Sequence, residues 1–255
     1  MRTRLMSFNV RVNVSVDGKH AWDYRKPHVF DFILNDAPDL IGFQEVSPSM
    51  LDELKTALPM YHAFGKGRDQ RGEGTPVFIR KDRFQIIDAH TFWLSDTPEV
   101  ESVLNGSHFP RIATYAVLED HEHHRMLLFN THLDYASDEI SLSQAKILYK
   151  KMIELQVIHG GSLLLTGDFN RYPESKTVRY LTSKLNSVYE NKSKITLTFH
   201  GYSKDTKGYP IDYIMTTSDI DILSFEVIHH FLPDQYLSDH YPIAIYFDII
   251  EGFKP

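Results

Sequence analysis

The chain has 255 residues, of which 42% are hydrophobic and 24% are charged, and its formal net charge is −7. This composition is typical of a globular protein. The sequence contains no cysteine, which excludes a disulfide framework, a thiolate metal site and a cysteine nucleophile. The acidic balance argues against a long electropositive tract for duplex nucleic acid.

The sequence shows no targeting or membrane-spanning segment. Its N-terminal region lacks the apolar core of a secretory signal, and no run approaches the roughly 20 apolar residues of a membrane span. No linker or low-complexity run divides the sequence. We therefore expect a single domain over residues 1–255, located in the cytoplasm, with no membrane association and no obligate protein partner.

Short apolar runs predict strands, and apolar residues at three-to-four spacing predict helices. In chain order, we expect a strand at 4–9, a helix at 26–35, a strand at 40–45, a helix at 47–58, strands at 76–80, 84–94, 112–119 and 125–132, a helix at 141–156, a strand at 162–168, a helix at 173–184, and strands at 211–216, 222–228 and 243–249.

The helix at 141–156 is the clearest of these elements. Ser137 or Asp138 is its expected cap, and the His-Gly-Gly sequence at 159–161 ends it. Short turns at 81–83 and 119–125 indicate hairpins between the flanking strands. Strands outnumber helices, which favours an α/β fold with two packed sheets and helices outside.

Polar side chains stand where the predicted strands end. The segment SLLLTGDFN at 162–170 places the side chains of Asp168 and Asn170 on the same side at the end of a predicted strand, because alternate residues of a strand point to the same side. Asp and Asn also favour turns, so each occurrence alone is a weak signal. The collection at the other strand ends is stronger, and it comprises Asn9, Glu45, His132, Asp134, Asp212, Asp239 and His240.

This set of side chains fits one kind of chemistry. Carboxylates and neutral oxygen ligands suit Mg²⁺, which proteins bind through few carboxylates together with water and substrate phosphate. A histidine beside an aspartate makes an oriented general base, and amide and histidine donors stabilise charge that grows in the transition state. The set therefore predicts metal-assisted attack of water on a phosphate ester.

The segments FNVR, DLIGFQEV, NTHLD, TGDFN, TFHGY, IDYI and SDHYP, in that order, resemble the endonuclease/exonuclease/phosphatase superfamily. That superfamily includes DNase I, inositol-polyphosphate 5-phosphatases and deadenylases of the Ccr4/nocturnin type, and the chain looks closest to uncharacterised bacterial members near the last branch. The resemblance implies a DNase I-like fold. This is a four-layer α/β sandwich of two mainly antiparallel sheets, with helices outside and the site at one edge.

The resemblance also implies roles for the strand-end residues. Glu45 resembles the main metal ligand, with Asn9 and Asp239 as supporting ligands of Mg²⁺ or Mn²⁺. His240 resembles the catalytic base, and Asp212 resembles its orienting carboxylate. The other matching residues position the nucleophile or contact phosphate, and they are Asp168, Asn170 and His132.

Two further residues are candidate substrate contacts. Arg111 opens an apolar strand and is a candidate phosphate clamp, although an exposed strand-end arginine is the alternative. His200 is a candidate lining residue of the substrate pocket, beside Phe199 or Tyr202 as stacking surfaces. Core packing is an equally good interpretation of those two aromatic residues.

Two loops have both a functional and a plain interpretation. The Gly-rich loop at 65–74 is basic and is either a cover for a polyanion or a solvated loop, and Glu73 within it resembles a site-adjacent glutamate. The HEHH segment at 121–124 suggests zinc, but its spacing is not that of HExxH. We expect a solvated hairpin turn there.

Three functions compete on this evidence. The first is an Mg²⁺-dependent phosphodiesterase or nuclease acting on single-stranded nucleic acid or a small nucleotide. The second is a phosphomonoesterase acting on a sugar, inositol or nucleotide phosphate. A basic, aromatic-lined groove would favour the first, and a short closed pocket with one or two arginines would favour the second. The third, a non-catalytic binding protein, predicts loss of a metal ligand or of the His–Asp pair, and the sequence retains both.

Overall fold

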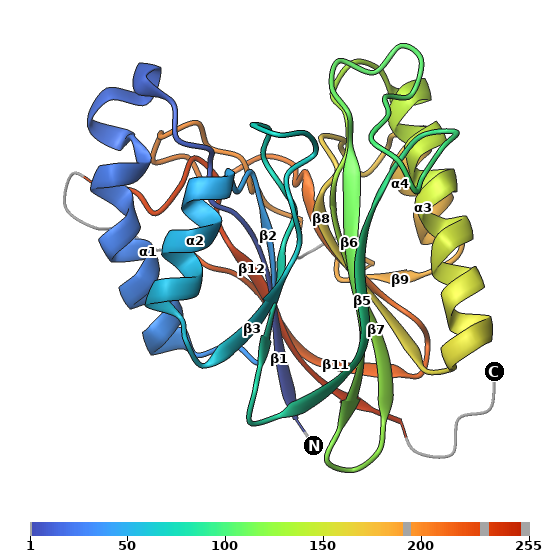
Figure 1. The fold of residues 1–255 in the computed structure, drawn as a ribbon. Helices are drawn as coiled ribbons and strands as arrows, with labels where there is room; N and C mark the ends of the chain where they lie inside the picture. The colour runs from blue at the N-terminus through green and yellow to red at the C-terminus, as the bar shows by residue number, and fades with distance from the viewer. Residues whose placement is uncertain (1, 191–194, 230–234, 251–255) are drawn as a thin grey trace.

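The computed structural model describes residues 2–190, 195–229 and 235–250. Two six-stranded sheets pack face to face, and helices cover the outer face of each sheet (Figure 1). Each sheet is mixed, with one parallel pair of strands and otherwise antiparallel neighbours. This architecture confirms the predicted four-layer α/β sandwich of the DNase I type.

The first sheet has the strand order β11-β12-β1-β2-β4-β3, with β1 parallel to β2. Helices α1 (Trp22–Asp36) and α2 (Pro48–Ala57) lie on its outer face (Figure 1). Its strands are β1 (Thr3–Asn9), β2 (Leu40–Gln44), β3 (Tyr61–Phe64), β4 (Val77–Arg80), β11 (Ile220–Val227) and β12 (Ile243–Ile249).

The second sheet has the strand order β5-β6-β7-β8-β10-β9, with β7 parallel to β8. Helices α3 (Asp138–His159) and α4 (Lys176–Thr182) lie on its outer face (Figure 1). Its strands are β5 (Phe84–Trp93), β6 (Ile112–Asp120), β7 (Arg125–His132), β8 (Ser162–Asp168), β9 (Asn186–Ser187) and β10 (Asp212–Thr216).

Strand β1 illustrates how the alternating pattern builds the molecule. Met6 and Phe8 join the core beneath α1 and α2, whereas Leu5 joins the core that extends between the sheets. Asn9 follows Leu5 by an even number of residues and therefore points to the same side. Its side chain reaches Asp168 at the end of β8 in the other sheet, with Nδ2 3.0 Å from Oδ2. The ends of strands from both sheets thus meet at one edge.

Buried polar side chains join the two sheets just below this edge. Asn130 of β7 donates from Nδ2 to the backbone oxygen of Phe43 at 2.7 Å, and its Oδ1 accepts from Gln44 Nε2 at 2.7 Å and from Thr166 Oγ1 at 3.0 Å. Gly42 leaves the space for this network, because a Cβ atom at Gly42 would lie 2.1 Å from Thr166 Oγ1 and 2.6 Å from Asn130 Oδ1. The close approach holds the ends of β2 and β8 near each other.

One predicted hairpin is wrong. The strands on either side of the turn at 81–83 belong to different sheets, because β4 pairs with β2 and β3 whereas β5 pairs with β6. A short turn between alternating segments shows that the chain reverses, but it does not show which sheet the next strand joins. The turn after β6 does link a hairpin, and Asp120 Oδ1 closes it by accepting from the amides of Glu122 and His124. The solvated-turn interpretation of the HEHH segment agrees with this arrangement.

The element boundaries also differ from the predictions at several places. Helix α3 begins earlier and ends later than predicted, and Ser137 caps it by accepting from the amide of Ile140 at 3.2 Å. Helix α4 is shorter than the predicted 173–184, because Ser175 is its cap. The sequence patterns missed the short elements β3, β9 and the 3₁₀ helix η1 (Ser15–His20). Within the described residues, no helix combines the length and apolar character needed to cross a bilayer.

Candidate active site

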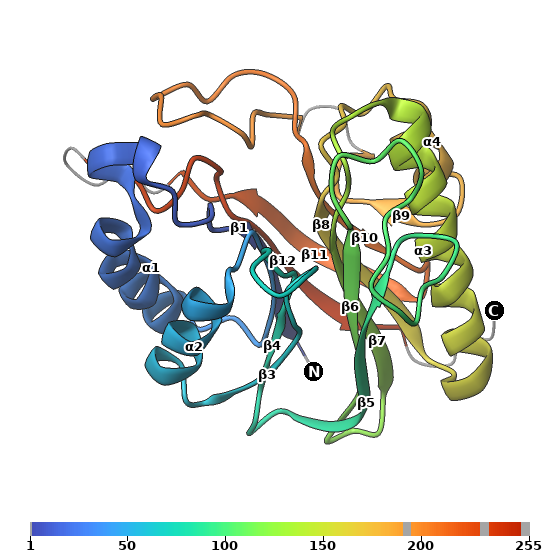
Figure 2. The same ribbon diagram turned by 45° about the horizontal axis from the view of Figure 1, so that its top comes forward.

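A cavity of about 420 Å³ opens where the strand ends of the two sheets meet. Figure 2 turns this end of the sandwich toward the viewer and shows the loops that follow β1 and β8 on opposite sides of it. The cavity contains most of the residues predicted from the strand ends. Its polar lining comprises Arg11, Glu45, Arg68, Glu73, Arg111, His132, Asp168, Asn170, Asp239 and His240.

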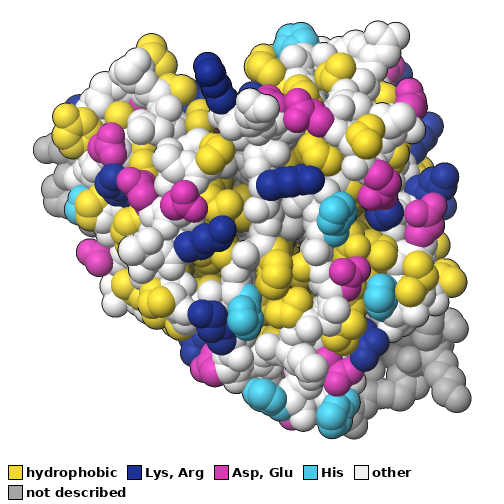
Figure 3. All heavy atoms as spheres, viewed as in Figure 1, with side chains coloured by type: hydrophobic (Ala, Val, Ile, Leu, Met, Phe, Trp, Pro, Cys, Tyr) yellow, Lys and Arg dark blue, Asp and Glu magenta, His cyan; other side chains and the backbone are white. Residues whose placement is uncertain are grey.

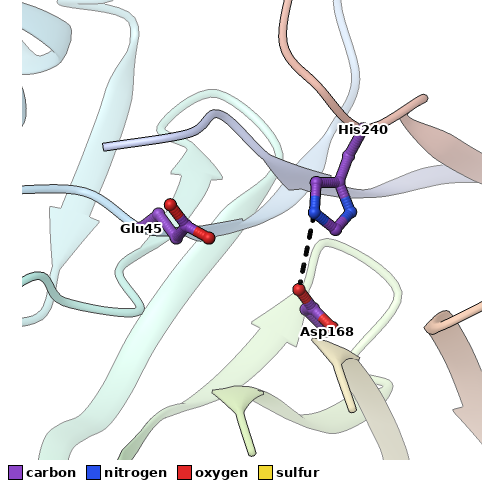
Figure 4. Close-up of side chains that lie close together, drawn as sticks. All are labelled: Glu45, Asp168 and His240. Carbon is purple, nitrogen blue, oxygen red and sulfur yellow. Dashed lines mark ion pairs between the residues drawn. The ribbon is translucent and has the colours of Figure 1, made fainter. Parts of the chain in front are cut away.

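Three side chains from separate strands converge at the centre of this cavity (Figure 4). Glu45 follows β2 and Asp168 ends β8, whereas His240 precedes β12. Possible ligand atoms of all three lie within 4.8 Å of one another. His240 Nε2 is 3.7 Å from Asp168 Oδ2, the ion pair drawn in Figure 4. The arrangement combines an acidic cluster with an imidazole ring.

Hydrogen bonds fix the carboxylate of Glu45 from two sides. Asn9 Nδ2 donates to Glu45 Oε1 at 3.0 Å, and the amide of Val12 donates to Glu45 Oε2 at 3.0 Å. Asn9 Oδ1 in turn accepts from the amide of Arg11 at 3.0 Å. Asn9 therefore presents its amide nitrogen, rather than its oxygen, to the acidic cluster.

The donor set fits a divalent cation. Burial and the nearby Glu45 raise the pKa of Asp239, although His240 and Arg11 act against this shift. The nearest arginine is not in tight contact, since Arg11 Nε is 3.7 Å from Asp239 Oδ2 and Arg11 Nη1 is 3.9 Å from Glu45 Oε2. Clustered carboxylates without a close arginine or lysine offer the hard oxygen ligands that Mg²⁺ prefers. These acidic and histidine groups can therefore hold a divalent metal.

His240 and Asp212 form a buried pair. His240 Nδ1 donates to Asp212 Oδ2 at 2.9 Å, and both side chains are less than 5% exposed. Asp212 is in register with Asp168 across the β8–β10 pair, so sheet pairing sets its position. Burial lowers the pKa of His240, but Asp212, Asp168 and Asp239 outweigh burial and raise this pKa to about 10. The pair has the geometry of an oriented imidazole with one nitrogen facing the cavity.

Asp168, Asn170 and His132 form a second connected group. The amide of Asn170 donates to Asp168 Oδ1 at 2.8 Å, and Asn170 Nδ2 donates to His132 Nε2 at 2.8 Å and to the carbonyl of Leu133 at 3.0 Å. Burial and the charge of Asp212 raise the pKa of Asp168 to about 7. Burial and the charge of Arg111 hold the pKa of His132 well below its ordinary value, so this ring is neutral.

Left-handed backbone conformations concentrate at the cavity. Of the six described non-glycine residues with positive φ, three line it, namely Arg11 (57°), Glu45 (59°) and Asn170 (52°). Such conformations cost about 1–3 kcal/mol each and persist where the surrounding contacts impose them. The strained positions agree with a functional site at this edge.

The predicted substrate contacts occupy different places. Arg111 lines the cavity. Phe199 also lines it, with 45% of its side chain exposed and its ring centroid 5.0 Å from that of His240. His200 is buried outside the cavity lining and stacks on Tyr241 at 4.1 Å. Tyr202 stacks on His20 at 4.5 Å, away from the lining. Of the aromatic residues predicted as stacking surfaces, Phe199 is therefore the one placed to contact a substrate.

The sequence patterns did not single out two residues that hold the site together. Arg11 binds Asp17 through Nε and Nη2 at 3.0 and 3.2 Å, and its only signal was its place in the FNVR segment. Arg25 of α1 is fully buried and gave no signal, because a lone arginine on a helix looks like a solvated residue. Its guanidinium donates at 2.6–2.9 Å to four backbone carbonyls, those of Val10, Arg11, His20 and Leu237.

Comparison with known proteins places the chain in a family. A model of the Endonuclease/Exonuclease/phosphatase family matches residues 6–240. The structure resembles a mannosyl-6-phosphatase of Bacteroides thetaiotaomicron, with 26% identity, a TM-score of 0.90 and coverage of 97% of this chain and 100% of that chain. It also resembles an endonuclease/exonuclease/phosphatase from Bacteroides vulgatus, with 29% identity, a TM-score of 0.90 and coverage of 98% and 99%.

A curated relative outside bacteria is Carbon catabolite repressor protein 4 homolog 3 of Arabidopsis thaliana, which is 25% identical over 68% of this chain. The chain spans 38% of the length of that plant protein. The family match covers most of the chain, and most of the residues predicted from the strand ends line one cavity. This chain belongs to the Endonuclease/Exonuclease/phosphatase family and is a phosphate-ester hydrolase.

Proposed function

We propose that the chain is an Mg²⁺-dependent phosphoesterase that hydrolyses a small phosphorylated substrate. The observation that carries this proposal is the convergence of Glu45, Asp168, Asp239 and the His240–Asp212 pair in a bounded cavity of about 420 Å³. This volume falls within the range of small-molecule sites, about 300–1,000 Å³. On the face seen in Figure 3, basic side chains are interspersed with acidic and apolar ones and form no continuous basic tract for nucleic acid.

The proposed roles follow from the positions of the side chains. Glu45 and Asp239 would hold Mg²⁺, which supplies Lewis-acid polarisation of the phosphate ester and offsets its negative charge. Asn9, predicted from the sequence as a supporting ligand, would instead position Glu45 and Asp168 by donating to both from Nδ2. Asp212 holds the His240 ring through Nδ1, which leaves Nε2 to exchange a proton with water or with the phosphate. Asn170 and His132 also line the cavity and would act as neutral phosphate contacts. In this scheme, Asp168 orients the attacking water or assists the leaving oxygen.

A sugar phosphate is our first candidate substrate. The similarity to a mannosyl-6-phosphatase over nearly the whole chain supports a monoester of a phosphorylated sugar. A nucleotide or a single-stranded phosphodiester is the second candidate, because the exposed rings of Phe109, Tyr135 and Phe199 line the same cavity and offer stacking surfaces.

The test is a substrate panel with purified protein in the presence of MgCl₂, MnCl₂ or EDTA. The panel holds hexose 6-phosphates, mononucleotides, bis-p-nitrophenyl phosphate and short single-stranded RNA and DNA. Glu45→Gln and His240→Ala should each abolish turnover, whereas the control His62→Ala, on the exposed side of β3, should retain it. Turnover that EDTA does not reduce, or that survives in both site variants, would overturn the proposal.

A further inference from the structure

Two arginines from separate loops converge on one wall of the cavity. Both Arg68 and Arg111 line it, with 12% and 4% of their side chains exposed. We propose that Arg68 and Arg111 form a clamp for the terminal oxygens of a phosphate monoester and thereby select monoesters over diesters. This inference rests on the proposed function and adds the kind of ester that the site prefers.

The guanidinium group of Arg111 has more N–H donors than there are acceptors around it. A guanidinium group carries five N–H donors, and among the described residues Arg111 has one hydrogen bond, from Nε to Asp134 Oδ2 at 3.4 Å. Its Nη1 is 3.9 Å from Glu73 Oε1, beyond hydrogen-bond range. Because Arg111 lines the cavity, its remaining N–H donors are open to water or to a ligand there. An anion in the cavity would satisfy those donors.

Arg68 is held beside Arg111 with donors to spare. Its Nη1 donates to Glu73 Oε1 at 2.5 Å, and its backbone amide donates to the Glu73 carbonyl at 3.1 Å. Its Nε is buried 3.9 Å from Asp69 Oδ2, whereas its Nη2 group has no acceptor among the described residues and is the donor left for a ligand. The same carboxylate oxygen of Glu73 thus faces both guanidinium groups, which draws two like charges together.

The surroundings of the pair make it rigid. The ring of Phe109 lies under both guanidinium groups, with its centroid 4.2 Å from Arg68 Cζ and 5.6 Å from Arg111 Cζ. Asp134, which binds Arg111, is itself fixed by Ser107 Oγ at 2.8 Å and by the amide of Phe109 at 3.3 Å. A planar fork that is already in place loses little entropy when it binds phosphate.

The position of the pair suits the phosphate being hydrolysed. Both arginines line the same cavity as His132, and His132 is joined through Asn170 to Asp168. A monoester offers three terminal oxygens and a second negative charge, whereas a diester offers two terminal oxygens and one charge. Two guanidinium forks therefore gain more from the monoester.

The experiment compares two esters with the same leaving group, p-nitrophenyl phosphate and methyl p-nitrophenyl phosphate, at saturating MgCl₂. The variants are Arg68→Gln and Arg68→Lys, and the control is Arg83→Gln. Arg83 binds Asp39 at 2.9 Å, at the opposite end of β2 from Glu45. We expect Arg68→Gln to lower kcat/KM for the monoester by about 10- to 100-fold and for the diester by less than about 3-fold. Arg68→Lys should recover only part of the loss, because an ammonium group lacks the fork.

The outcomes separate this inference from the proposed function. Equal losses of kcat/KM on both esters, or no loss on the monoester, would overturn the clamp but would not contradict the proposed function. If the wild type hydrolyses neither ester, the clamp is still tested by the dissociation constants of inorganic phosphate and dimethyl phosphate, measured by calorimetry. The clamp then requires Arg68→Gln to weaken binding of inorganic phosphate by at least about 10-fold relative to Arg83→Gln, and an unchanged constant would refute it.

Discussion

The packing of the two sheets at Gly42 makes a sharp prediction for Gly42→Ala. The new Cβ would lie 2.1 Å from Thr166 Oγ1 and 2.8 Å from Asn130 Cγ, both in buried strands of the other sheet. Alanine has no side-chain rotation that relieves such contacts, so Thr166 and Asn130 must rotate out of their hydrogen bonds or the sheets must separate locally. Overpacking costs about 1–3 kcal/mol. Loss of two of the Asn130 hydrogen bonds adds about 1–3 kcal/mol. Together these two contributions give an expected destabilisation of about 2–6 kcal/mol.

Urea unfolding monitored by tryptophan fluorescence would measure this change. The control is Gly160→Ala, where no atom lies within 4 Å of the added Cβ and only the positive φ of 67° opposes it. A double variant, Gly42→Ala with Thr166→Ala, removes the shortest contact and should recover at least about 1 kcal/mol beyond additivity. A loss below about 1 kcal/mol for Gly42→Ala, or strict additivity in the double variant, would refute the idea that this contact sets the sheet spacing.

Three further predictions concern the site. Asp212→Asn should lower kcat by about 10²- to 10⁴-fold, because His240 loses its orienting carboxylate, and an activity near wild type in initial-rate assays would contradict this. Burial and Asp212 raise the pKa of Asp168 to about 7, so this carboxyl group is protonated at pH 6 and ionised at pH 8. MgCl₂ should therefore raise Tm more at pH 8 than at pH 6 in thermal unfolding, and an equal or larger rise at pH 6 would count against Asp168 facing the metal. Arg25→Lys should cost about 2–4 kcal/mol in urea unfolding, because an ammonium group cannot serve four carbonyls. It should also weaken Mn²⁺ binding, measured by calorimetry. The control Val29→Ala, on the same helix, should lower stability without weakening Mn²⁺ binding.

Much of the candidate site could be predicted because its residues stand at recognisable strand ends. Asp168 and Asn170 follow an apolar run, and the two-residue period of a strand puts them on one side before any tertiary contact is known. Glu45 and His240 were found in the same way. The chemistry of these residue types then narrows the reaction to phosphate-ester hydrolysis.

The residues that support and shape the site escaped this reasoning. Arg25 acts through backbone carbonyls of three separate segments, and no local pattern reports which carbonyls a helix residue will meet. Arg68 lies in a Gly-rich loop whose sequence fits either a cover for a polyanion or a solvated loop, and only the placement of Glu73 and Phe109 around it locates its guanidinium group. The hairpin predicted at 81–83 failed for the same reason, because the choice of sheet is a non-local one.

The sequence by itself determined the strands, the faces they bury and the kinds of side chain at their ends, because these follow from the period of a strand and from side-chain chemistry. Only the tertiary structure decided that Glu45 of one sheet faces Asp168 of the other, and that two arginines share one wall of the cavity. The physical reason is that the distance between the sheets depends on close contacts such as Gly42 against Thr166, between residues far apart in the chain.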